Sequence, residues 1–330
     1  KADCLTEARG DHTVRTSLLD ARRITGDAAL FADFAAAFRA ACTESGAAGY
    51  IAAKQTERAA RHRRYGDSAF VVEPNIKEGR GGLRDLQMLY WIARYIFGSS
   101  TMGELAAPEG PAGGLLTAAE ARRALRSWNF LWALRFHLHY VAGRAEERLT
   151  FDLQPVVGAR MGYTRHSRQD GVERFMRHYF LTAREVVRLT RVLEPALVRA
   201  ALGPPAAASG RAEAAVAAAG FMLADGQLLP AKGRDFAHES IQMLRILQVA
   251  RDRDLKLHPL AIRGMIRNER RAQDLRGNME AAALFLDLLC GLDAAHNRAD
   301  GARWMSILNE TGLLGRFLPD WARVVGQMQF

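Results

Sequence analysis

Apolar residues recur at helical spacing along most of the chain. The spacing predicts helices over residues 27–42, 51–64, 85–97, 117–140, 172–201, 239–251, 259–268, 279–292 and 302–310. Two of these helices carry a start signal in the sequence. Asp27 is a candidate N-cap, and Thr117 with Glu120 three residues later is typical of a capping box. We therefore expect a mainly α protein built as a helical bundle.

Two segments depart from the helical pattern. Phe221–Leu229 reads FMLADGQLL, with Asp225-Gly226 between two apolar runs, and this predicts a small β-hairpin with a type I′ turn. Residues 1–25 contain short β-tolerant runs at Thr13–Arg15 and Leu18–Leu19. We expect these runs to form the last strand of a larger α/β unit.

The composition is that of an ordinary globular protein. The chain has 330 residues, of which 49% are hydrophobic and 25% charged, so it is long enough for two domains and is not a disordered or fibrous sequence. The formal net charge is +10, and only five of the 46 cationic residues are lysines. Arginine binds phosphate and carboxylate groups, so nucleic acid, nucleotides and acidic proteins are all admissible partners. An alanine- and arginine-rich chain is also typical of a high-GC genome.

The three cysteines, Cys4, Cys42 and Cys290, follow no metal-binding spacing and no disulfide framework. This usage favours a reduced compartment, the cytoplasm. No apolar run reaches the length of a membrane span, so we expect no membrane partner. The sequence begins at Lys1 and stops at Phe330 inside an apolar stretch, and we expect a fragment cut at both ends.

The stretch Glu73–Asp85 carries the most chemical information. It reads EPNIKEGRGGLRD and places three glycines within four positions directly before a predicted helix. Such glycines allow positive φ and close backbone approach, and free N–H groups at a helix start favour an anion. Lys77, Arg80 and Arg84 add positive charge, so the stretch is a candidate phosphate cradle. The alternative is a tight turn leading into the helix, with Asp85 near its N-cap.

Other motifs give no catalytic centre. His137 and His139 are two residues apart and lie on different faces of a helix, so they cannot chelate a metal as an i, i+4 pair does. The D-x-D of Asp252 and Asp254 closes a helix and is interpreted as a solvated helix end. None of the nine histidines is followed by aspartate, and no G-x-S-x-G elbow occurs. We expect no catalytic residue and no metal ligand in this chain.

Residues 73–93, EPNIKEGRGGLRDLQMLYWIA, resemble the signature of the bifunctional uridylyltransferase/uridylyl-removing enzymes, which modify the PII signalling protein. Three further blocks, over residues 143–163, 172–183 and 308–330, are similar to that family in the same order. The resemblance implies a domain order for the chain. Residues 1–45 would be the C-terminal remnant of an α/β nucleotidyltransferase domain, 46–202 a helical domain, 203–211 a linker, and 212–330 a helical segment leading into a missing HD phosphohydrolase domain.

The resemblance also implies an activity. The whole enzyme would transfer UMP from UTP to a tyrosine of PII with Mg²⁺, and its HD domain would remove UMP by hydrolysis. Glutamine would act as effector through ACT domains. The Mg²⁺ ligands and catalytic residues would lie outside this chain, which would be inactive alone. Asp20 would be a leftover acidic residue of the transferase site. The candidate substrate-binding residues are Glu73, Asn75, Lys77, Glu78, Gly79, Gly81, Gly82, Arg84 and Asp85.

Two alternatives remain. The adenylyltransferase of glutamine synthetase carries a similar K-x-G-x-G-G-I-R-[DE] block, which makes it the nearest enzyme rival. A non-catalytic, basic, helical RNA-binding module is the rival from another class. It would need aromatic residues interleaved with the basic runs, and the run Arg61–Arg64 is followed only by Tyr65. We therefore expect no nucleic acid partner.

Overall fold

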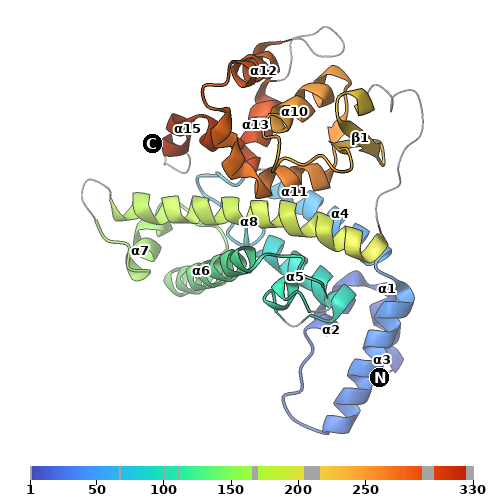
Figure 1. The fold of residues 1–330 in the computed structure, drawn as a ribbon. Helices are drawn as coiled ribbons and strands as arrows, with labels where there is room; N and C mark the ends of the chain where they lie inside the picture. Colours follow the sequence, from blue (N-terminus) through green and yellow to red (C-terminus); the bar gives the residue numbers. More distant parts are fainter. Residues whose placement is uncertain are drawn as a thin grey trace. The chain divides into compact units, whose positions relative to one another are not determined.

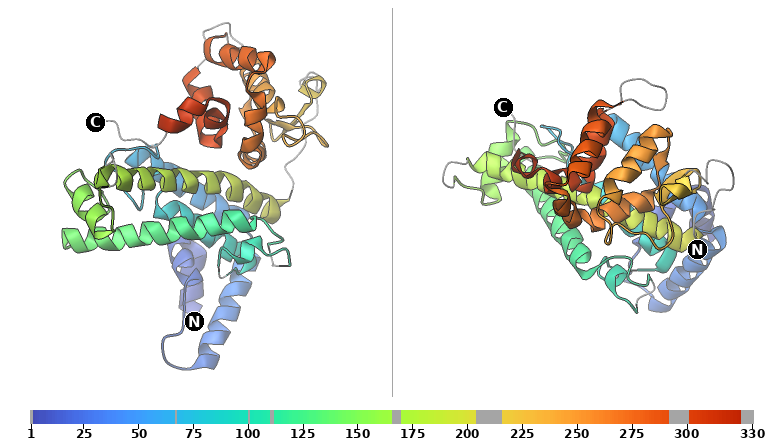
Figure 2. Two further views of the ribbon diagram at one scale, coloured as in Figure 1. Left: turned by 60° about the vertical axis from the view of Figure 1, so that its left-hand side comes forward. Right: turned by 45° about the horizontal axis from the view of Figure 1, so that its top comes forward.

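The computed structural model describes residues 2–66, 68–99, 101–109, 112–165, 170–203, 216–291 and 301–324. The chain divides into two compact units, residues 1–203 and 204–330, each shown by its colour range in Figures 1 and 2. Apart from Gly203, the predicted linker over residues 203–211 lies outside the described residues. None of the helices described is long and apolar enough to cross a membrane.

The first unit is helical. Its elements are α1 (Ala2–Gly10), α2 (His12–Leu19), α3 (Ala28–Ser45), α4 (Ala48–Tyr65), α5 (Leu83–Phe97), the 3₁₀ turn η1 (Glu104–Ala106), α6 (Ala118–Ala142), α7 (Leu153–Arg160) and α8 (Gly171–Leu202). Helix α8 packs against α5, α6 and α7, and Figure 1 shows it running along this group. The long helices predicted from apolar spacing are confirmed to within a few residues at their ends.

Local sequence explains why these helices begin and end where they do. The Thr117 side chain accepts the N–H of Glu120, and the Glu120 carboxylate accepts the N–H of Thr117, which confirms the predicted capping box. Helix α5 buries a stripe that includes Leu86, Leu89 and Ile92, and it ends at Gly98 in the left-handed conformation. Burial of this stripe orients α5, and with it the loop that precedes it.

The prediction of a strand within residues 1–25 is wrong, because this segment forms α1 and α2. The Asp11 carboxylate accepts the N–H groups of Thr13 and Val14 and caps α2. The Arg15 guanidinium also donates to the carbonyl of Ala8 at 2.6 Å, which closes the turn between the two helices. Capping and this tertiary contact outweigh the weak β preference of Thr13 and Val14.

The second unit combines short helices with a small sheet. Its elements are β1 (Phe221–Ala224), β2 (Gln227–Pro230), α10 (Gln242–Asp252), β3 (Lys256–Leu257), α11 (Pro259–Arg267), the 3₁₀ turn η2 (Glu269–Leu275), α12 (Met279–Cys290), α13 (Gly301–Thr311), α14 (Leu313–Phe317) and α15 (Pro319–Val324). The predicted hairpin is confirmed: Leu223 pairs with Leu228, and Asp225 and Gly226 both have positive φ. The sequence did not predict β3, whose two residues are too few to show a period.

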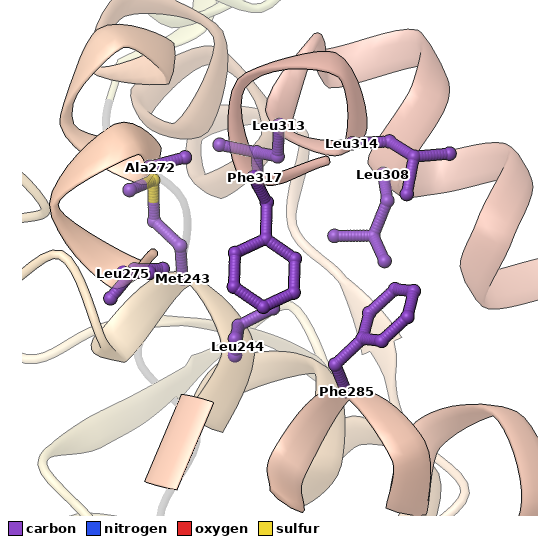
Figure 3. A pocket seen from close by; sticks show the side chains of 9 residues that line it. All are labelled: Met243, Leu244, Ala272, Leu275, Phe285, Leu308, Leu313, Leu314 and Phe317. Atoms are coloured by element: carbon purple, nitrogen blue, oxygen red, sulfur yellow. The ribbon is translucent and has the colours of Figure 1, made fainter. Parts of the chain in front are cut away.

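The core of the second unit contains a small cavity lined only by apolar side chains. Figure 3 shows the rings of Phe285 and Phe317 beside each other among the lining residues, with centroids 5.3 Å apart and one ring edge-on to the other. The lining residues are Met243, Leu244, Ala272, Leu275, Phe285, Leu308, Leu313, Leu314 and Phe317. These described lining residues present only apolar surface, so we assign the space to core packing between α10, η2, α12, α13 and α14.

Candidate functional site

The glycine-rich stretch forms a closed turn that leads into α5. The Asn75 side-chain oxygen accepts the N–H groups of Lys77 at 3.2 Å and Glu78 at 2.7 Å. The first N–H groups of α5 also stay within the loop: Leu83 donates to Ile76 O at 3.0 Å and Arg84 to Lys77 O at 2.9 Å. The helix start therefore does not offer the free N–H groups that the sequence led us to expect for an anion.

The three glycines are required by close packing of the chain on itself. A Cβ on Gly81, whose φ is +80°, would lie 2.4 Å from the carbonyl oxygen of Ala183 in α8. A Cβ on Gly79 would lie 2.6 Å from Asn75 O, and one on Gly82 would meet three carbonyl oxygens within 2.9 Å. The sequence predicted that the glycines allow a close approach to the backbone. In the structure, the groups that come close to them are carbonyl groups of the loop itself and of Ala183 in α8.

Asp85 fastens this loop to α4. Its side chain is only 1% exposed and accepts hydrogen bonds from His62 Nε2 at 3.0 Å, Arg61 at 3.2 Å and the Gly81 N–H at 2.9 Å. Burial alone raises the pKa of Asp85, but the hydrogen bond and charge of His62, with Arg61 and the Gly81 N–H, outweigh it. The pKa of Asp85 therefore lies below its ordinary value, and the carboxylate stays charged.

Two of the predicted cations reach the surface of the loop. The side chains of Lys77 and Arg84 are 25% and 24% exposed. Both face the carboxylate of Glu78, with Lys77 Nζ at 3.6 Å and an Arg84 guanidinium nitrogen at 3.3 Å. The Arg84 guanidinium also lies over the ring of Trp91, 5.2 Å from its centroid. These contacts hold the two cations on one side of the loop.

A second block of the sequence supports the loop from the side. Asn75 forms an antiparallel bridge with Arg148, and the Ile76 N–H donates to Glu147 O at 2.9 Å. The Glu73 carboxylate accepts from the Arg148 guanidinium at 2.8 Å and from the Phe151 N–H at 2.9 Å. Two of the blocks singled out in the sequence, residues 73–93 and 143–163, therefore form one structural unit.

Glu147, in that second block, forms an ion pair with Arg135. The Glu147 carboxylate accepts three contacts from the Arg135 guanidinium, at 2.7 to 3.1 Å, and lies 3.7 Å from Lys77 Nζ. Arg135 in turn lies over the ring of Trp132. The sequence did not identify Glu147 and Arg135 as neighbours of the loop, because they lie far from it along the chain.

The contacts of Arg61 and His62 with Asp85 could not be predicted from the sequence either. In the sequence, the basic run at the end of α4 was weighed only as an RNA contact. His62 and Asp85 are 23 positions apart, so no helical spacing connects them.

The remaining predicted positions have other surroundings. Asp20 accepts the Trp91 Nε1–H at 3.0 Å and lies 3.9 Å from Arg94. Asp252 is half-exposed, as expected for a helix end, and pairs with Arg251 at 2.6 Å. Among the residues that the structure describes, no group of three His, Cys, Asp or Glu side chains could hold a metal ion.

Fold and site together define a mainly helical protein organised around a rigid glycine-rich loop that presents cations at its surface. Residues 49–194 match the family model described as GlnD PII-uridylyltransferase. The chain is 50% identical over 343 aligned positions to the bifunctional uridylyltransferase/uridylyl-removing enzyme of Gluconobacter oxydans, covering 100% of this chain and 35% of that protein. It is 41% identical to the enzyme of that name in Rhodospirillum rubrum, covering 99% and 34%.

By this similarity the chain belongs to the family of bifunctional uridylyltransferase/uridylyl-removing enzymes. It spans about a third of the length of the curated relatives that it matches. No solved structure matches it. The resemblance inferred from the four sequence blocks is therefore confirmed.

Proposed function

We propose that this chain is the helical part of a cytoplasmic enzyme of nitrogen regulation that transfers UMP from UTP to a tyrosine of the PII protein and removes it by hydrolysis. The observation that carries the proposal is the 50% identity to the Gluconobacter oxydans enzyme along the whole chain. Glutamine would be the effector of the whole enzyme, acting through ACT domains.

Within that enzyme, the loop would serve as a rigid platform for two cations. Five of the nine candidate residues shape the loop, because Asn75, Gly79, Gly81, Gly82 and Asp85 face the protein's own backbone or α4. Glu73 joins the loop to the second block.

Lys77 and Arg84 are the candidates for contact with UTP phosphates or with the PII loop. Their ammonium and guanidinium groups are partly exposed, and the loop that carries them is fixed on several sides. A cation held in place beside a developing pyrophosphate stabilises the transition state without reorganisation, and this can contribute several kcal/mol. The sequence left two interpretations of residues 73–85 open, a phosphate cradle and a tight turn into the helix. In this proposal the tight turn supports the two cations that contact the phosphate.

The proposal includes Mg²⁺ as cofactor of the transferase. Mg²⁺ takes carboxylate oxygens and phosphate oxygens as ligands. The described residues of this chain form no such carboxylate cluster, so they do not fit the ion and we derive no step through it.

The test uses the protein at its natural length. Purified protein would be incubated with PII, Mg²⁺ and UTP labelled at the α-phosphate, and a PII variant with phenylalanine at the modified tyrosine would serve as control. We expect label on PII and none on the control, and release of UMP when labelled PII is returned to the enzyme. Label transferred from ATP to glutamine synthetase, with none from UTP to PII, would refute the proposal.

A further inference from the structure

The carboxylate of Glu78 lies among three cations. It is 3.7 Å from Arg61, 3.6 Å from Lys77 and 3.3 Å from Arg84, and the Arg61 guanidinium also donates to the Glu78 carbonyl oxygen at 3.3 Å. The Glu78 side chain is 18% exposed. One carboxylate thus faces cations from α4, from the loop and from the first turn of α5.

The contacts of Glu78 are long compared with those of its neighbour. Charge-assisted hydrogen bonds between nitrogen and carboxylate oxygen are about 2.7 to 2.9 Å long. Arg135 holds Glu147 at 2.7 Å in a two-pronged contact, whereas none of the three cations comes closer than 3.3 Å to Glu78. Glu147 is clamped and Glu78 is held loosely, so Glu78 is the carboxylate that can leave.

Arginine and lysine bind phosphate and carboxylate through the same groups. A phosphate carries more charge and more acceptor oxygens than a carboxylate, and it would satisfy the three cations with shorter bonds. The Glu78 N–H is fixed by Asn75, so the side chain can turn away while the backbone of the loop keeps its shape.

We propose that Glu78 is an internal competitor that occupies an anion site formed by Arg61, Lys77 and Arg84, and that a phosphate group of a nucleotide or pyrophosphate displaces it. The inference rests on the proposed function for Lys77 and Arg84 and adds Arg61 to the site. An anion must therefore bind the three cations more strongly than the Glu78 carboxylate does. A phosphate meets this condition and a weakly charged anion does not.

The test measures pyrophosphate binding to the protein at its natural length by titration calorimetry, in the wild type and in Glu78→Gln. Removing the competing charge while keeping its shape should lower the dissociation constant by about threefold to tenfold. The matched control is Glu185→Gln, because Glu185 is similarly exposed, pairs with Arg123 and changes the net charge equally. The control should leave the dissociation constant unchanged.

Two further variants keep the outcome decisive. Glu78→Asp retains the charge but shortens its reach, so it should bind pyrophosphate with intermediate affinity even if Glu78→Gln does not fold. Adding Arg84→Ala to Glu78→Gln should abolish the gain. Equal or weaker binding by Glu78→Gln, while Arg84→Ala alone weakens the wild type, would overturn this inference and leave the proposed phosphate contact standing. No binding by any variant would overturn both.

Discussion

Replacing Gly81 by alanine tests whether the loop is held by close contact with α8. The φ of +80° costs a residue with a Cβ about 1–2 kcal/mol. The added Cβ would lie 2.4 Å from the carbonyl oxygen of Ala183, and forced repacking of this kind costs about 1–3 kcal/mol. We therefore expect Gly81→Ala to lower the free energy of unfolding by about 2–5 kcal/mol, summing these terms.

Gly143→Ala is the matched control in the same unit. Gly143 has a φ of +65°, but a Cβ there meets nothing within 4 Å, so only the conformational cost of about 1–2 kcal/mol applies. Both variants would be unfolded in urea and followed by tryptophan fluorescence and far-ultraviolet circular dichroism. A loss of stability in Gly81→Ala no larger than that in Gly143→Ala would refute the proposed packing.

Three further predictions follow from the charged groups. Asp85→Asn removes the buried negative charge that faces Arg61 and His62 and should cost about 3 kcal/mol in urea unfolding. Because the folded state lowers the pKa of Asp85, its contribution is present above about pH 4 and is lost as the pH falls further. Wild type should therefore lose stability on acidification more steeply than Asp85→Asn, and parallel profiles would contradict this. In the protein at its natural length, Arg84→Ala should lower uridylylation by about tenfold, about 1.4 kcal/mol, and leave uridylyl removal nearly unchanged. Equal loss of both activities, together with a lower melting temperature, would show that Arg84 only braces the start of α5. Arg251 is 7% exposed and binds Asp287, which is 38% exposed, at 2.6 Å, so solvent screens the carboxylate left behind and Arg251→Met should cost about 1–2 kcal/mol in urea unfolding. Asp252→Asn, at a half-exposed carboxylate that leaves the Asp287 contact in place, should cost less.

The helices that the sequence predicted are those whose apolar spacing is long enough to show a period. The elements that it missed are short or depend on capping: α1 and α2 form where β-tolerant residues follow Asp11, and β3 has only two residues. The hairpin was predictable because Asp225-Gly226 fixes the turn by local geometry.

The candidate site was predictable in position but only partly in character. Three glycines within four residues identified the loop, and that signal is local because it reflects backbone conformation. The sequence could not show that Gly81 meets the carbonyl of Ala183 or that the first N–H groups of α5 bond within the loop. It therefore suggested an anion at the helix start, where the structure provides loop carbonyls.

The sequence by itself determined the helical periods, the hairpin turn and the position of the glycine-rich loop, because each depends on residues that are neighbours along the chain. Only the tertiary structure decided how the charges of the loop are paired. Asp85 meets Arg61 and His62 from α4, and Lys77 meets Glu147 from a segment about seventy residues later. Ion pairs form between side chains that the fold brings within a few ångströms, and separation along the sequence carries no information about that distance.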